Sequence, residues 1–223
     1  MDLIELQRDL ECVYELAGAA QPVADYLFSD AQLVGGLDPA GPGHYTEEAL
    51  LIQQDGDELF MSLYLSEALM ERLVDDSPLD ALHDGNLPDL CLAVEGVSHY
   101  LFVSWNATYD RPVTQVDLEL QAEVDKFVAV VRLLERQGLP YSDAVISGLF
   151  RSVSFDDGLS PQEQNRYRLA NRAAEAYCTN LAERYLSSQG VSTRTFYADL
   201  RRFYRLRGEA KLRYTASPGR LVP

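Results

Sequence analysis

The stretch CLAVEGVSHYLFVSWN, residues 91–106, decides how the fold is interpreted. It holds a cysteine, a glutamate, a histidine and the single tryptophan of the chain. Two apolar runs flank Glu95-Gly96, a pattern that indicates two strands joined by a tight turn. The second run is apolar on both strand faces, as in a strand that lies inside a sheet and is covered twice. We therefore predict a β-hairpin here.

The same stretch offers a candidate catalytic constellation of Cys91, Glu95 and His99. A thiol nucleophile needs an imidazole within hydrogen-bond reach on the same side. Side chains alternate along a strand, so a two-residue turn places Cys91 and His99 on opposite faces. A three-residue loop places them on one face, but diagonally, about 7–8 Å apart. The hairpin interpretation therefore disfavours a Cys–His pair and favours a buried structural cysteine.

The rest of the chain predicts an α+β fold. Residues 47–65 indicate a hairpin with a turn at Asp55-Gly56. Helices are predicted over residues 2–18, over 114–137 after a capping residue at Thr114, from a capping box at Ser160 to about 188, and after Ser192. We expect a four-stranded antiparallel sheet from two hairpins, packed against helices, with a helical C-terminal region.

Two arrangements of domains fit this pattern. One has an acidic α+β domain over residues 1–155 and a basic helical region over 156–223 packed on it, with the linker near residue 155. The other is a single continuous domain. A chain of 223 residues is long enough for either.

Composition indicates a cytoplasmic protein. No run of about 18 apolar residues predicts a membrane span, and the polar, acidic start does not resemble a signal peptide. Cys12, Cys91 and Cys178 are far apart and form no C-x-x-C motif. Such isolated cysteines are typical of reduced thiols and of neither a disulfide framework nor a cysteine zinc site.

The charge is large and unevenly distributed. The net charge is −16, with 21 acidic and two basic residues in positions 1–100, and an excess of basic residues after position 150. Such asymmetry predicts two surfaces with different partners, or two parts of the chain that attract each other. Acidic residues that serve only solubility are the alternative.

Basic and aromatic side chains alternate in the last predicted helix. The candidate binding residues are Arg194, Arg201, Arg202, Arg205, Tyr197 and Tyr204. Such a pattern can contact nucleic-acid phosphates, but the acidic remainder of the protein would repel them. Docking on the protein's own acidic part, or on an acidic partner, is favoured.

No metal or cofactor site is predicted. The motif His44-x-x-Glu47-Glu48 has two ligand types one helical turn apart, yet it lacks a closing histidine and precedes a predicted strand. Nucleotide-binding glycine motifs and the G-x-S-x-G and H-E-x-x-H motifs are missing from the sequence.

These observations favour a non-catalytic interaction protein, such as an adaptor, an accessory subunit or a chaperone-like or inhibitor-like module, that binds a protein partner with a basic surface. An enzyme is not favoured. Two alternatives remain: a hydrolase-type enzyme with a dispersed acidic or cysteine site, and a nucleic-acid-associated protein that uses the C-terminal arginines. The sequence fixes neither the partner nor the oligomeric state.

Overall fold

The computed structural model describes residues 1–16, 18, 20–29, 46–152, 159–186 and 193–216. The α-helices in these ranges are α1 (Leu3–Tyr14), α3 (Glu67–Asp75), α4 (Leu87–Ala107), α5 (Gln115–Arg136), α6 (Ala144–Ile146), α7 (Pro161–Tyr185), α8 (Thr193–Tyr204) and α9 (Gly208–Ala216). The strands are β1 (Leu27–Phe28), β2 (Glu48–Asp55) and β3 (Glu58–Leu65). A 3-10 turn (Val23–Tyr26) precedes β1, and a π-helical turn (Ser147–Arg151) follows α6.

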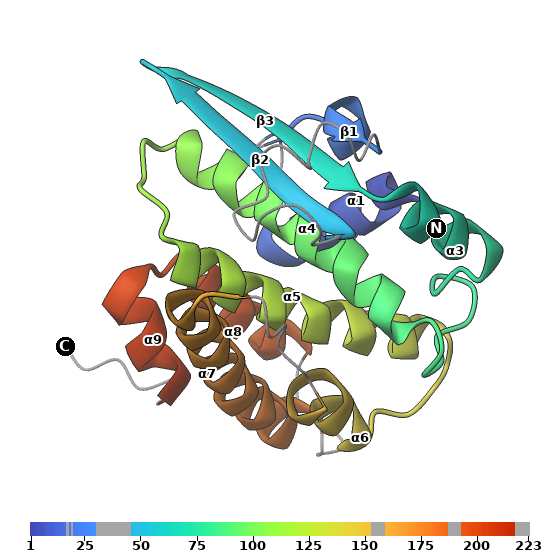
Figure 1. The fold of residues 1–223 in the computed structure, drawn as a ribbon. Helices are drawn as coiled ribbons and strands as arrows, with labels where there is room; N and C mark the ends of the chain where they lie inside the picture. The colour runs from blue at the N-terminus through green and yellow to red at the C-terminus, as the bar shows by residue number, and fades with distance from the viewer. Residues whose placement is uncertain (17, 19, 30–45, 153–158, 187–192, 217–223) are drawn as a thin grey trace.

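Residues 91–106 belong to a helix, so the predicted second hairpin is wrong. They form most of α4, a 21-residue helix that runs through the middle of the molecule (Figure 1). It contacts α1, α3 and α5 as well as β2 and β3. A helix that is covered on nearly every side has no broad solvent-exposed face, and its sequence then lacks the 3.6-residue periodicity by which amphipathic helices are recognised.

Gly96 brings the hairpin close to the helix and does not form a turn. A Cβ atom at this position would lie 2.8 Å from Leu63 Cδ1 of β3 and 3.2 Å from Glu48 Cγ of β2. No real side chain tolerates the first distance without a shift of its neighbour. The glycine that indicated a strand turn is therefore a contact point between a sheet and a helix.

The sheet has three strands in the order β1-β3-β2 and is mixed. The hairpin of β2 and β3 is confirmed, with Asp55 paired to Glu58 and Gly56 in a left-handed conformation (φ 60°) in its two-residue turn. β1 pairs with β3 in parallel. The expected four-stranded antiparallel sheet is therefore wrong, because the segment that was to supply two of its strands is α4.

Local capping signals predicted the starts of two long helices correctly. Thr114 and Asp117 form a reciprocal capping box at the start of α5, and Ser160 and Glu163 form another at α7. Each box pairs two backbone N–H groups at the start of the helix, which have no partner within the helix, with side-chain oxygens.

The helices form layers around α4 and α5. The β2–β3 hairpin lies along one side of α4, and α7, α8 and α9 lie beyond α5 on the other side (Figure 1). One apolar cluster joins these layers, including Leu10, Phe102, Phe127, Tyr177 and Phe203. The predicted linker near residue 155 lies outside the described residues. Among the helices described, none is long and apolar enough to cross a membrane.

Candidate functional site

The helical form of residues 91–106 places Cys91, Glu95 and His99 on one face. Residues four apart in a helix lie above one another, so the strand alternation that separated these side chains does not apply. The face is turned towards the start of β2 and towards α5. Three further carboxylates approach it, from Glu48 at the first position of β2 and from Glu119 and Glu123 of α5.

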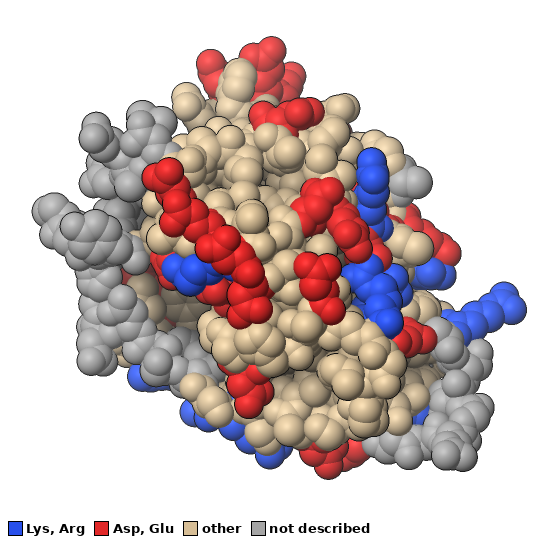
Figure 2. Space-filling model, turned by 90° about the vertical axis from the view of Figure 1, so that its right-hand side faces the viewer, with Lys and Arg blue, Asp and Glu red and all other residues tan. Residues whose placement is uncertain are grey.

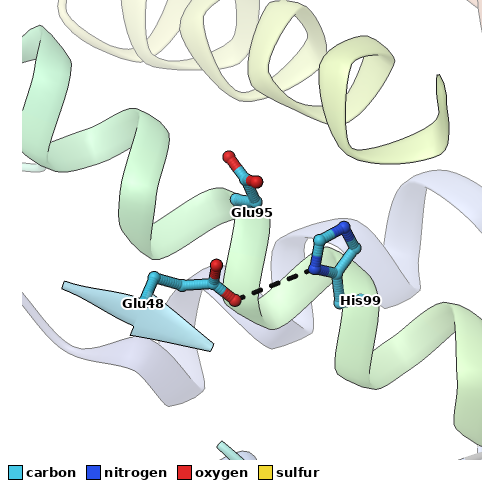
Figure 3. Close-up of side chains that lie close together, drawn as sticks. All are labelled: Glu48, Glu95 and His99. Carbon is cyan, nitrogen blue, oxygen red and sulfur yellow. Dashed lines mark ion pairs between the residues drawn. The ribbon is translucent and has the colours of Figure 1, made fainter. Parts of the chain in front are cut away.

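Glu48, Glu95 and His99 converge at the centre of this face. Each offers one ligand-type atom, and the three atoms lie within 4.8 Å of one another. His99 Nδ1 is 3.7 Å from Glu48 Oε1, and Figure 3 shows Glu48 reaching from the strand towards the imidazole while Glu95 and His99 project from the same helix. Gly96 lies directly beneath Glu48 and so allows this approach.

Two cations and two carboxylates of α5 complete the cluster. Lys126 Nζ lies 2.6 Å from Glu95 Oε2 and 2.8 Å from Glu123 Oε1. On the other side of the imidazole, His99 Nε2 is 3.9 Å from Glu119 Oε2. Arg166 of α7 lies 3.5 Å from Glu119 Oε1. Carboxylates outnumber the permanent cations, so the cluster carries negative charge when His99 is neutral.

Burial and mutual interactions shift the pKa values of these groups. Burial lowers the pKa of His99, but the neighbouring Glu48, Glu119 and Glu95 outweigh it and raise the pKa to about 9. Burial raises the pKa of Glu119 to about 7, and it raises the pKa of Glu48 above its ordinary value. Glu95 has a lowered pKa because Lys126 and His99 outweigh its burial. Such strongly perturbed groups in a groove are typical of functional sites.

Three polar atoms of the cluster lack hydrogen-bond partners among the described residues. They are Glu48 Oε1, His99 Nε2 and Arg166 Nε. The Glu48 side chain is 9 % exposed and His99 as a whole is 9 % exposed. Leaving a buried polar atom unpaired costs roughly 1–3 kcal/mol. Glu48 Oε1 faces His99 Nδ1 at 3.7 Å, and His99 Nε2 faces Glu119 Oε2 at 3.9 Å, both beyond hydrogen-bond distance. A bound species that pairs with these groups or draws them together would remove this cost.

The cluster opens onto a groove of about 2040 Å³. Both strands of the hairpin form one wall, and α4, the beginning of α5 and the beginning of α7 form the other. Its lining includes Ile52, Arg111 and Tyr167 besides the cluster residues. The groove is wide enough for a substrate larger than a metabolite of a few atoms.

Cys91, the other member of the predicted constellation, is separate from His99. Eight residues along a helix correspond to about 12 Å. Burial raises the pKa of the Cys91 thiol to about 11, so it is protonated at neutral pH. The structure thus brings Glu95 and His99 together but does not form a Cys–His pair.

Two of the predicted binding residues contact the protein's own first helix. Arg201 Nε donates to the Val13 carbonyl at 2.8 Å, and its guanidinium lies 2.6 Å from Glu15. Arg205 Nη2 donates to the Tyr14 carbonyl at 3.2 Å. Guanidinium groups at the C-terminal end of α1 satisfy free carbonyls and match the helix dipole.

The other predicted binding residues differ in their surroundings. Tyr204 is buried and stacks on Tyr14, with ring centroids 4.2 Å apart. Tyr197 accepts a hydrogen bond from Arg132 at 2.7 Å. Arg202 lies over the Tyr214 ring, and Arg194 is exposed.

Sequence reasoning missed Glu119, Lys126 and Arg166 as site residues. They lie on two other helices and carry no local motif. Glu48 was weighed only within the motif that begins at His44, a residue outside the described ranges. The four-residue spacing of Glu95 and His99 was the available signal, and it required recognising α4 as a helix.

Searches of protein-family models, curated proteins and solved structures found no match for this chain. The function is therefore inferred from the groove and its side chains.

Proposed function

We propose that the protein binds a divalent transition-metal ion through Glu48, Glu95 and His99 and acts as a hydrolase-type enzyme on a substrate held in the groove. The observation that carries this proposal is the convergence of ligand atoms of Glu48, Glu95 and His99 within 4.8 Å of one another, with Glu48 Oε1 buried and unpaired, in a cluster with an excess of carboxylates. A bound divalent cation would compensate the charge and pair with Glu48 Oε1, and it would leave His99 Nε2 to donate to Glu119.

The distances suit such an ion. Metal–nitrogen and metal–oxygen bonds of about 2.0–2.2 Å place neighbouring ligand atoms about 3.0–3.6 Å apart. His99 Nδ1 and Glu48 Oε1 are 3.7 Å apart, so a small side-chain rotation suffices. One Glu95 oxygen pairs with Lys126, and the second oxygen of that carboxylate is the one that would bind the metal.

Glu119 supports this arrangement from outside the ligand set. A histidine that binds a metal through one ring nitrogen commonly donates its other N–H to a carboxylate, which fixes the tautomer and raises the basicity of the ligand. Glu119 Oε2 faces His99 Nε2 at 3.9 Å, and Arg166 holds the other side of the Glu119 carboxylate. Closing this gap by about 1 Å would form that hydrogen bond.

The ligand set favours a transition metal with open positions. One imidazole and two carboxylates suit Zn²⁺, Mn²⁺ or Fe²⁺ better than Ca²⁺ or Mg²⁺, which prefer oxygen ligands alone. Three protein ligands leave positions for water and substrate, as in catalytic sites. A metal held by Glu48, Glu95 and His99 would supply Lewis acidity and would lower the pKa of water, which is the chemistry that hydrolysis needs.

Metal titration of chelator-treated protein tests the proposal. We expect one equivalent of Co²⁺ to bind, with the visible absorption of a protein-bound ion, and one equivalent of Zn²⁺ to compete for it. Glu48→Gln and His99→Gln should abolish this binding. His83→Gln is the matched control, because His83 is exposed and lies outside the cluster, where it contacts Asp76 and the Gly85 N–H. Stoichiometric binding that survives His99→Gln would refute the proposed site.

The second candidate is the interaction function expected from the charge. Acidic side chains spread across the face in Figure 2, whereas basic ones form a small group among them on the left and lie mainly on the right and along the lower edge. The outer half of the hairpin exposes Ile52 (46 %) and Phe60 (54 %), and β2 lies at one edge of the sheet. An acidic surface with exposed apolar side chains suits a partner that is basic around an apolar centre.

Hairpin variants test this second candidate. A partner captured from cell extract should associate more slowly as salt increases and should be lost with Ile52→Ser and Phe60→Ser. Val74→Ser is the control, since Val74 is exposed on α3, away from the hairpin. Equal capture by all three variants would exclude the hairpin as the interface.

A reducing compartment suits either function. Cys12, Cys91 and Cys178 are all free thiols. We propose that the protein resides in the cytoplasm, where thiols stay reduced. Maleimide labelling in intact cells that finds an oxidised cysteine pair would contradict this.

A further inference from the structure

A second pocket lies where α4 ends, and arginines dominate it. It has a volume of about 420 Å³ and is lined by Glu15, Trp105, Tyr109, Arg111, Arg205 and Arg207. Three guanidinium groups therefore converge in a protein whose net charge is −16. Like charges repel when they converge, so this arrangement requires a compensating group.

Arg111 is held in a fixed orientation by two aromatic rings. Its guanidinium carbon lies 4.9 Å from the centroid of Trp105 and 4.9 Å from that of Tyr109. The chain reverses just before it, where Asp110 adopts a left-handed conformation (φ 51°) and the Arg111 N–H donates to the Asn106 carbonyl. Stacking occupies the faces of the guanidinium and leaves its N–H edge for a ligand.

Arg205 and Arg207 are held by carbonyl groups, which fix their positions without neutralising their charge. Arg205 donates to the carbonyls of Arg201 and Tyr14, and Arg207 Nη1 is 3.5 Å from the Pro112 carbonyl. Within the described ranges, no carboxylate forms an ion pair with any of the three pocket arginines. The carboxylate that lines the pocket, Glu15, lies 2.6 Å from Arg201.

We propose that this pocket binds the phosphate group of a small phosphorylated ligand. A phosphate monoester carries close to two negative charges and accepts several hydrogen bonds, which matches a set of guanidinium forks better than a single carboxylate does. Tyr109 is 55 % exposed and offers an apolar surface beside the phosphate position. The net charge of −16 opposes a long polyanion, so a small ligand is favoured over nucleic acid.

The tryptophan in the wall of this pocket makes a direct test available. Trp105 is the only tryptophan of the chain, so its emission reports on this pocket alone. Metal-free protein at constant ionic strength is titrated with inorganic phosphate, with pyrophosphate and with a ten-residue oligothymidylate that lacks terminal phosphates. We expect a saturable change with phosphate and pyrophosphate, confirmed by calorimetry because a spectral change alone does not prove binding.

Matched arginine variants distinguish this pocket from general attraction of anions. Arg111→Gln and Arg207→Gln should each weaken pyrophosphate binding at least tenfold. Arg213→Gln removes the same charge from an exposed side chain, paired only with Glu209 at 3.5 Å, and should leave the affinity unchanged. Arg207 is included because loss of Arg111 also removes its stacking on both rings, and circular dichroism verifies that each variant is folded.

Three outcomes would overturn the proposal. The first is no saturable response to phosphate or pyrophosphate in both fluorescence and calorimetry at concentrations up to about 10 mM, a weak-affinity limit. The second is an equal loss of affinity in Arg213→Gln. The third is tighter binding of the oligothymidylate than of pyrophosphate, which would assign the arginines to nucleic-acid phosphodiesters. None of these depends on whether Glu48 and His99 bind a metal.

Discussion

Protonation of His99 is expected to stabilise the metal-free fold. The imidazole is buried between Glu48 and Glu119, and the carboxylates around it raise its pKa from 6.5 to about 9. The folded state therefore binds more protons than the unfolded state in this interval. The stabilisation is fully present below pH 6.5 and is lost as the pH rises through 9.

The size of this effect follows from the pKa shift. Each pKa unit corresponds to about 1.36 kcal/mol, so the shift contributes ~3 kcal/mol to the free energy of unfolding. The His99 side chain is 11 % exposed, so solvent screening removes little of it. A contribution of this size is a large fraction of the stability of an ordinary domain.

Urea unfolding at pH 6 and pH 9.5 measures the effect. The difference in stability between wild type and His99→Gln should decrease by ~3 kcal/mol between these two values. In the NMR spectrum, one histidine signal should titrate near pH 9 and be missing from His99→Gln. A constant difference between wild type and His99→Gln would refute the reasoning.

Metal affinity should follow the same titration. A metal must displace the proton from His99, so the affinity for Zn²⁺ should increase about tenfold per pH unit between pH 7 and 9. Calorimetry in two buffers with different ionisation enthalpies would detect about one released proton. No released proton at pH 7 would show that His99 is not a ligand.

Three further substitutions test other parts of the structure. Gly96→Ala should lower the free energy of unfolding by about 1 kcal/mol, because overpacking against Leu63 at 2.8 Å outweighs the gain in helix propensity; a more stable variant would show that the hairpin shifts freely. Lys211→Met should raise the free energy of unfolding by about 1 kcal/mol or more at pH 7. Burial penalises the charged form of Lys211, which lowers its pKa to about 7. The stability advantage of Lys211→Met should decrease from pH 7 to 10. Over that range the unfolded wild type binds more protons at Lys211 than the folded wild type, so the wild type becomes more stable as the pH rises. An advantage that does not change with pH would contradict the lowered pKa of Lys211. With a thiol reagent at pH 8, exposed Cys12 should react quickly and Cys91 slowly, as measured by labelling and peptide mass, and rapid labelling of Cys91 would contradict its raised pKa.

Local signals in the sequence predicted those elements whose ends are fixed by neighbouring residues. The hairpin follows from alternating apolar residues around Gly56, and the starts of α5 and α7 follow from their capping boxes. These features depend on contacts within a few residues, so they can be identified without knowing the fold.

The candidate site required longer-range information. Glu95 and His99 were recognised as chemically interesting, but their relation depended on the conformation of α4. Glu48, Glu119 and Arg166 come from a strand and two other helices. Their convergence depends on packing between distant segments, and the local residue pattern around each of them does not predict it.

The sequence by itself determined the acidic character, the isolated thiols, the β2–β3 hairpin and the boundaries of the capped helices, because composition and short-range hydrogen bonding specify them. Only the tertiary structure decided that residues 91–106 are helical. An apolar run that is covered on nearly every side has the same composition as a buried strand, and the partners that cover it settle the difference. Because this segment is helical, Glu95 and His99 lie on one face of α4 and approach Glu48. The residues around Glu95-Gly96, which resembled a strand turn, therefore line the groove.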